Sequence, residues 1–207
     1  MIPRTFHRVW LDEPVPEQFE IFWDGFRKLH PDWEFKSWEA SDELDWMQNR
    51  EMFDSFTDYP AAYALRADIA RYEILNRHGG VYIDTDMQAL KAFDPLLAYD
   101  EPFVAWCSEK ELDPATIGSP AGHPAMQYLV DQLAVVYKWT RQNKHLPVSP
   151  PGVTGPRFIT ERWRNRDDVR RLPPIFFFPH HWSSLRGKGG PYPAESYAVH
   201  HWNAGWK

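Results

Sequence analysis

Residues 79–86 read Gly-Gly-Val-Tyr-Ile-Asp-Thr-Asp and hold the strongest structural and chemical signal in the chain. The apolar run 81–83 predicts a strand that leads directly into Asp84 and Asp86. Because side chains alternate along a strand, the two aspartates are expected to point to the same side. Two like charges held together need a cation, and carboxylate oxygens suit magnesium, manganese or calcium. The motif therefore indicates a divalent-metal site that holds phosphates; the alternative is a turn whose aspartates face water.

A helix is predicted directly before this strand, from about Pro60 to Arg77, because apolar residues recur on one of its faces. The glycine pair that follows is suited to end that helix. Helices and strands alternate elsewhere too, with helices expected at 16–29 and 123–142 and strands at 5–11, 33–38, 103–107 and 175–178. This alternation favours an α/β sheet with helices on both faces, in a single domain over residues 1–207. Ligands of such sheets bind at the carboxyl ends of strands, where the two aspartates lie.

Composition narrows the classes of function. The net charge of -6 argues against nonspecific nucleic-acid binding. The 11 tryptophans suggest rings that pack on sugars or nucleobases, although most of them are expected in the core. A lone Cys107 excludes an internal disulfide framework, and the sequence shows neither a signal peptide nor a membrane span. We therefore expect a cytoplasmic protein without nucleic-acid partners, which can still contact a membrane peripherally.

Asp68 and Arg71 share one face of the predicted helix and are further site candidates. That helix leads into the aspartate motif, so this pair is expected near the same site. Asp68 can accept hydrogen bonds from ligand hydroxyls, and Arg71 can donate them or face phosphate. The alternative is a surface ion pair of little energetic value.

A histidine near the end of the chain is expected to complete the metal site, because neutral imidazole is a common ligand. His200 and His201 are adjacent and face opposite ways on a strand, so at most one is a ligand. We favour His201. Zinc catalysis is not favoured, since the helical spacing of a zinc protease is absent.

The chain resembles the DXD sugar-binding region of glycosyltransferase family 32, which includes capsular-polysaccharide transferases and mannosyltransferases and is related to the glucosyltransferase domains of clostridial toxins. Residues 64–75 and 79–86 carry the specific part of the resemblance. Four further segments are similar to the family, at 2–11, 118–124, 154–156 and 200–206. The stretch 113–117 departs from it, since relatives often carry an asparagine there and this chain has none.

This resemblance implies a GT-A fold and transfer of a sugar from a nucleotide-sugar donor with retention of configuration. Manganese or magnesium is the implied ion, held by Asp86, with Asp84 contacting ribose and metal-bound water and a terminal histidine (His200 or His201) adding a contact. By the same pattern Asp68 and Arg71 grip the donor sugar, Trp10 stacks on the nucleobase, and Tyr82 belongs to the donor-binding strand. The implied acceptor is a glycan, glycolipid or protein, as in polysaccharide or glycolipid synthesis. Neither the base (UDP or GDP) nor the sugar is specified.

Two other functions remain open from the residues alone. A haloacid-dehalogenase-like phosphatase also has a strand that ends in Asp-x-Asp, with the first aspartate as nucleophile. That class needs a later acidic pair after a strand, and Asp167-Asp168 lies among arginines instead. A carbohydrate-binding module without catalysis would use tryptophans as platforms and the aspartates for calcium. The arginine-rich stretch 162–171 either docks an anionic surface or forms a solvated helix face.

Overall fold

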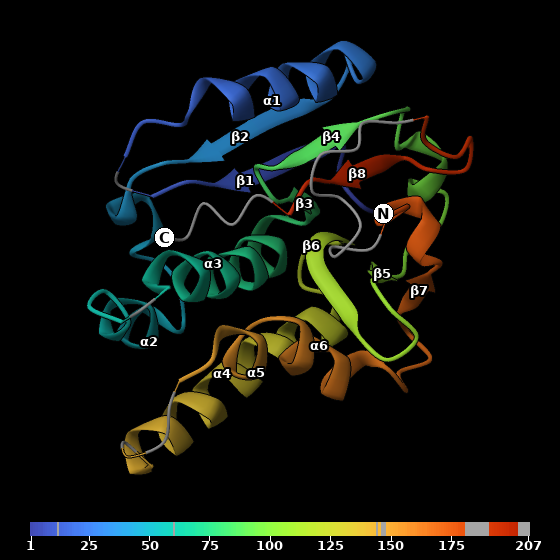
Figure 1. The fold of residues 1–207 in the computed structure, drawn as a ribbon. Coiled ribbons are helices and arrows are strands. Elements are labelled where there is room, and N and C mark those ends of the chain that lie inside the picture. The colour runs from blue at the N-terminus through green and yellow to red at the C-terminus, as the bar shows by residue number, and fades with distance from the viewer. Residues whose placement is uncertain (12, 60, 144, 146–147, 181–190, 203–207) are drawn as a thin grey trace.

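The computed structural model describes residues 1–207 except 12, 60, 144, 146–147, 181–190 and 203–207 (Figure 1). Its centre is a six-stranded sheet in the order β2-β1-β3-β6-β5-β7. β6 runs antiparallel to its neighbours β3 and β5, whereas the other adjacent pairs are parallel. The strands are β1 (Thr5–Val9), β2 (Glu34–Trp38), β3 (Gly80–Ile83), β5 (Phe103–Trp106), β6 (Leu112–Ser119) and β7 (Arg170–Leu172).

Helices cover both faces of this sheet, as the alternating sequence pattern predicted (Figure 1). One face carries α1 (Glu17–Leu29) and a two-stranded antiparallel ribbon of β4 (Met87–Ala89) and β8 (Ala198–His200). The opposite face carries the other helices, namely α2 (Arg50–Ser55), α3 (Ala62–His78), α4 (Pro124–Gln142), α5 (Pro150–Val153) and α6 (Pro156–Trp163). Short 3-10 turns complete the elements: η1 (Ser41–Leu44), η2 (Asp94–Leu97) and η3 (Pro174–Phe176). No helix within the described residues is both long and apolar enough to cross a bilayer.

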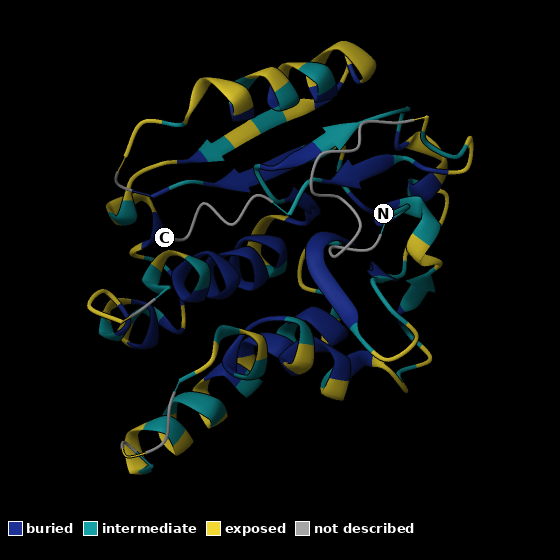
Figure 2. Cartoon of the chain, in the orientation of Figure 1, coloured by how far each residue is buried: buried dark blue, intermediate teal, exposed yellow. Residues whose placement is uncertain are grey.

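β3 is buried on both faces, which explains why its sequence is continuously apolar. Val81 and Ile83 pack into the cluster on the α1 side, while Tyr82 packs into the cluster on the α3 side. Figure 2 shows the same burial along α3, whose residues 65–75 are all buried. The central helix and strand are therefore held rigidly, and so are the residues that follow the strand.

The glycine pair between α3 and β3 is required by backbone geometry. Gly79 and Gly80 have φ values of +66° and +97°, a region that side chains disfavour. A Cβ on Gly80 would lie 2.6 Å from the carbonyl oxygen of Thr5 in the neighbouring strand. The prediction that glycine ends this helix is confirmed.

Two local predictions were wrong. β3 ends at Ile83, and Thr85 and Asp86 form a turn, so alternation along a strand is not what brings the aspartates together. The segment 175–178, expected to be a strand, begins in the 3-10 turn η3. Prolines 173 and 174 at its start have no N–H to donate to a strand ladder.

Candidate active site

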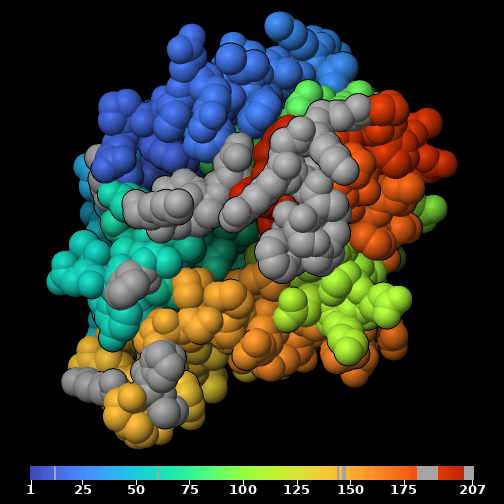
Figure 3. All heavy atoms as spheres, viewed as in Figure 1, coloured from blue at the N-terminus to red at the C-terminus, as the bar shows by residue number. Residues whose placement is uncertain are grey.

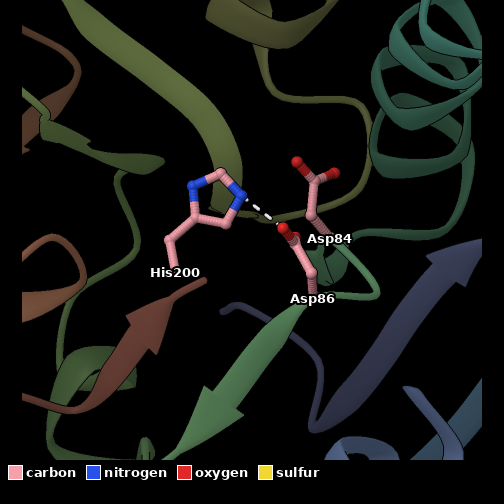
Figure 4. Close-up of side chains that lie close together, drawn as sticks. All are labelled: Asp84, Asp86 and His200. Carbon is pink, nitrogen blue, oxygen red and sulfur yellow. Dashed lines mark ion pairs between the residues drawn. The ribbon is translucent and has the colours of Figure 1, made fainter. Parts of the chain in front are cut away.

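The aspartate motif lies at the edge of the sheet where β1 and β3 end. The Asp84 N–H donates to the carbonyl of Ala115 in β6 at 2.8 Å, and the Met87 N–H donates to the Asp84 carbonyl at 3.1 Å. These bonds close a tight turn at the end of a buried strand. Asp84 and Asp86 are thus placed side by side by main-chain hydrogen bonds (Figure 4).

His200 reaches this turn from the other end of the chain. β8 pairs with β4 so that His200 lies opposite Met87, the residue after the motif. The imidazole Nε2 of His200 is 3.0 Å from Asp86 Oδ1, and both side chains are buried (Figure 4). One ligand atom each from Asp84, Asp86 and His200 lies within 4.8 Å of the others.

His201 points away from the aspartates, so the preference for it over His200 is corrected. Its Nε2 is 2.9 Å from Gln88 Oε1, and its ring stacks on Phe22 of α1 at 4.8 Å with an interplanar angle of 4°. Its main-chain N–H contacts the motif by donating to the Asp86 carbonyl at 3.1 Å. The β4–β8 register, which no local sequence pattern reveals, decides which histidine faces the site.

Arg71 links the helix to the motif. Its Nη2 lies 2.8 Å from Asp68 Oδ1 and 3.0 Å from Asp84 Oδ1, and the side chain is 4% exposed. Its guanidinium also stacks over the Tyr82 ring, whose hydroxyl donates to Asp84 Oδ1 at 3.0 Å. A solvated surface pair, the alternative left open by the sequence, is excluded by this burial.

The pKa values in this cluster follow from burial and pairing. Burial opposes the charge of Arg71, but Asp84, Tyr82 and Asp68 raise its pKa well above the ordinary value. Burial raises the pKa of Asp68 to about 6, although Arg71 and the hydroxyl of Thr154 favour its charged form. That hydroxyl donates to Asp68 Oδ2 at 2.8 Å. The charged form of the buried Asp68 therefore depends on the neighbouring cation Arg71 and on the Thr154 hydroxyl.

The Asp84, Asp86 and His200 atoms suit a divalent ion. Burial opposes the charge of His200, but Asp86 in contact with it, with Asp113 and Asp84 nearby, raises its pKa to about 9. The imidazolium thus supplies a positive charge between carboxylates, and it must lose its proton before it can ligate an ion. Two carboxylates with one imidazole form a donor set that manganese or magnesium accepts. The residues present fit the implied metal.

A cleft of about 260 Å³ opens over this cluster. Trp10 and Phe19 line one part of it, and α3 contributes Ala64 beside Asp68 and Arg71. The remaining lining residues are Val9, Tyr82, Asp84, Thr85, Asp86, Asp113, Pro114, Pro150, Pro151, Pro156, His200 and Trp202. Figure 3 shows one face of the molecule with N-terminal residues in blue on one side and residues of α3 and α5 in teal and orange on the other. Every residue predicted for the site except His201 lines this cleft.

Among the lining residues that sequence reasoning did not predict for the site, Asp113 and Trp202 lie close to the motif or its histidine. Asp113 is a buried acid in β6, and the ring of Trp202 lies beside that of His200, with centroids 4.1 Å apart and an interplanar angle of 43°. The signal for Asp113 was an acid between Leu112 and Pro114 in a segment with β-forming residues. For Trp202 it was the aromatic residue directly after the histidine pair.

The arginine-rich stretch 162–171 is largely occupied by internal contacts. Arg170 and Arg171 donate to main-chain carbonyls, and Arg166 forms a two-bond pair with Asp168. These contacts favour a structural role over the anionic docking surface. The sequence contains a second pair of adjacent histidines, His180 and His181, of which His181 lies outside the described residues.

Comparison with known proteins agrees with this geometry. Residues 16–103 match the family model described as glycosyltransferase sugar-binding region containing DXD motif. Inositol phosphoceramide mannosyltransferase 3 of Schizosaccharomyces pombe is 30% identical over 87% of this chain and 49% of its own length. Mannosyl phosphorylinositol ceramide synthase SUR1 of Saccharomyces cerevisiae is 30% identical over 88% of this chain and 49% of its own length. The chain thus spans about half the length of these relatives.

Solved structures establish the fold. The PaToxG glycosyltransferase matches with a TM-score of 0.65 and 16% identity, over 78% of this chain and 68% of that one. The UDP-bound glycosyltransferase domain of the YGT toxin matches with a TM-score of 0.57 and 12% identity, over 83% and 79% of the two chains. The predicted GT-A fold is confirmed. Over residues 16–103, the chain is similar to the family of glycosyltransferase sugar-binding regions that contain a DXD motif.

Proposed function

We propose that this chain is a metal-dependent glycosyltransferase that moves a hexose from a nucleotide sugar to a hydroxyl of a glycolipid. One observation carries the proposal: Asp84, Asp86 and His200 converge in a cleft beside the buried Asp68–Arg71 pair. The family match and the glycosyltransferase names of the relatives support it.

Asp84, Asp86 and His200 would hold manganese or magnesium. When bound, the ion supplies positive charge against the diphosphate that leaves the sugar. In the absence of the ion, protonated His200 balances Asp86, so the motif stays assembled. Asp84 is oriented by its contacts with Arg71 and the Tyr82 hydroxyl.

The nucleotide sugar is proposed to lie along the cleft. Trp10 offers an aromatic surface for the base, and Asp68 and Arg71 bind hydroxyls of the sugar. A toxin domain of similar fold is described as UDP-bound, which supports a nucleoside diphosphate as the common part of the ligand. The ceramide mannosyltransferase names of the relatives favour mannose as the sugar and an inositol-containing glycolipid as the acceptor.

The same contacts weigh against the alternatives. A phosphatase nucleophile must be free to attack, whereas Asp84 Oδ1 is engaged by both Arg71 and Tyr82. A calcium-binding lectin has no need of the buried Arg71 in its site. Transfer with retention of configuration remains the family expectation. In the mechanism that we propose, the departing phosphate accepts the proton of the attacking hydroxyl.

The first test is binding. Thermal unfolding is followed with UDP, GDP and their sugars, with and without manganese, because ligands stabilise the state they bind. We expect one nucleoside diphosphate to raise the melting temperature only when manganese is present, and the corresponding nucleotide sugar to be hydrolysed slowly without acceptor. Release of phosphate from simple phosphomonoesters, with no response to any nucleotide, would contradict the proposal.

A further inference from the structure

Thr154, Gly155 and Pro156 form the junction between α5 and α6, and the proposed function gives this junction no role. Thr154 and Gly155 are buried, whereas Pro156 begins α6 and lines the cleft. The N–H groups of Thr154 and Gly155 both donate to the carbonyl of Pro150, at 3.0 and 2.8 Å. The junction is therefore a tight, buried turn directly behind the cleft.

Helix α3 holds this junction at two points that lie one helical turn apart. The Tyr72 hydroxyl donates to the main-chain carbonyl of Thr154 at 2.7 Å. The Thr154 hydroxyl in turn donates to Asp68 Oδ2 at 2.8 Å. Asp68 and Tyr72 are four residues apart and share one face of α3. Tyr72 thus fixes the main chain from which the Thr154 hydroxyl reaches the carboxylate.

The absence of a side chain at Gly155 permits this close approach. A Cβ at that position would lie 3.3 Å from Asp68 Oδ2 and 3.1 Å from the carbonyl oxygen of Pro150. The φ of Gly155 is -94°, so its backbone conformation is open to other residues and the constraint is one of space. The sequence of the junction is therefore fitted to the carboxylate of Asp68.

The hydrogen bond from Thr154 fixes the orientation of Asp68. Rotation of a carboxylate about its terminal torsion is otherwise broad. Here Oδ1 faces Arg71 and Oδ2 accepts from Thr154, so both oxygens are held in place. Each oxygen keeps a second lone pair, and Asp68 lines the cleft. The carboxylate is thus presented to a ligand in one orientation.

We propose that Thr154 is a positioning residue for recognition of the donor sugar, which acts by holding Asp68 in the orientation that accepts the sugar hydroxyls. Thr154 itself is fully buried and does not line the cleft. This inference rests on the proposed function, in which Asp68 binds the sugar and the ion faces the diphosphate. The junction therefore contributes to binding of the nucleotide sugar, and not to binding of the nucleoside diphosphate alone.

The test is Thr154→Val, which keeps the shape of the side chain and removes its donor. Isothermal titration measures the affinities of GDP-mannose and GDP, and of UDP-glucose and UDP, all with manganese. For the pair that binds the wild type, we expect the affinity of the nucleotide sugar to fall about tenfold, the size of a lost hydrogen bond to a charged group. The affinity of the nucleoside diphosphate should stay unchanged. Thr154→Ser retains the hydroxyl and should bind the nucleotide sugar like the wild type.

Thr160→Val is the matched control. Thr160 is also buried in this region, but its hydroxyl donates to the Pro156 carbonyl at 2.6 Å and accepts the Leu112 N–H at 2.8 Å. Its loss should lower the free energy of unfolding and leave both affinities unchanged. Urea unfolding gives the folded fraction of each variant, so that affinities refer to folded protein. Thr154→Ala removes the same donor without a branched side chain and should show the same selective loss as Thr154→Val.

The outcomes separate the inference from the proposed function. Equal losses of affinity for the nucleotide sugar and the nucleoside diphosphate would overturn the positioning role of Thr154. Unchanged binding of the nucleotide sugar would also overturn it, as would a loss in Thr154→Ser as large as that in Thr154→Val. A wild-type protein that binds none of these four ligands with manganese would contradict the proposed function itself.

Discussion

Helix α3 carries two buried acids with opposite surroundings. Asp68 lines the cleft and pairs with Arg71, a cation that is shared with Asp84. Glu73 points into the interior, where its Oε1 accepts both the main-chain N–H and the side-chain amide of Asn49 at 2.8 Å each. Asn49 also donates to the Val130 carbonyl at 2.9 Å, which ties α3 to α4.

The difference separates an acid that builds the fold from one suited to bind a ligand. Neutral amide donors surround Glu73 in a closed network, and burial raises its pKa while the Asn49 donors oppose that rise. Asp68 instead depends on a neighbouring cation in an open cleft, so a ligand can redistribute its contacts. We therefore expect substitution of Glu73 to lower the stability of the fold, and substitution of an acid in the cleft to lower activity.

The largest expected effect is that of Asp86→Ala. It removes one of the three metal donors, and we expect the turnover number at saturating donor and manganese to fall about 10³-fold or more. Thermal unfolding should show that the fold is intact. If the variant retained its turnover at saturating manganese, the acids of the cleft could no longer be distinguished from structural acids such as Glu73 by their role in activity.

Glu73→Ala tests the other side of the comparison. Two donors of Asn49 would lose their acceptor in the interior, so we expect the free energy of unfolding to fall by about 3 kcal/mol. Urea unfolding measures this loss. Activity per folded molecule should stay at the wild-type value, and Glu73→Gln should be milder because its Oε1 can still accept. A loss of specific activity in the folded fraction would place Glu73 in the functional machinery.

A second closed network, at His7 in β1, sharpens the comparison through pH. The ring lies 3.0 Å from the Gly79 carbonyl and accepts from Trp38 Nε1 at 3.3 Å, an arrangement of the neutral imidazole. Burial, with smaller effects of His78 and Lys36, lowers the pKa of His7 from 6.5 to about 4. Because the unfolded state binds this proton first, the stabilisation is complete above about pH 6.5 and is lost as pH falls towards 4.

Wild-type protein should lose up to about 3 kcal/mol of unfolding free energy across this window because of His7. The contribution is measured as the difference from His7→Gln, which removes this titration and leaves the carboxylates in place. If the free energy of unfolding fell equally with pH in the two proteins between pH 6.5 and 4, the claim that buried His7 is neutral in the folded protein would be excluded.

The smallest effects separate the adjacent histidines. His201→Ala loses the stacking on Phe22 and should lower stability by about 1 kcal/mol without changing manganese affinity. His200→Ala should weaken manganese binding about tenfold. Isothermal titration with manganese and UDP or GDP measures both variants. Equal manganese affinities for the two would refute the assignment of His200.

Much of this arrangement was predictable because its signals are local. The apolar spacing of Leu65, Ile69 and Tyr72 with the following glycine pair predicted α3 and β3, and the family resemblance predicted the GT-A fold. Helix α2 was missed because only Met52 and Phe53 of its six residues are buried and apolar. The sequence also gave no means to choose His200, since β8 pairs with β4 across more than half the chain. The cleft position of Asp113 depends in the same way on the antiparallel pairing of β6.

The central claim is tested most directly by a crystal structure with manganese and the nucleoside diphosphate that stabilises the protein. We predict an anomalous peak for the ion within about 2.3 Å of oxygens of both Asp84 and Asp86, with the diphosphate on its far side. An ion or nucleotide bound elsewhere, with these two carboxylates turned into solvent, would contradict the account.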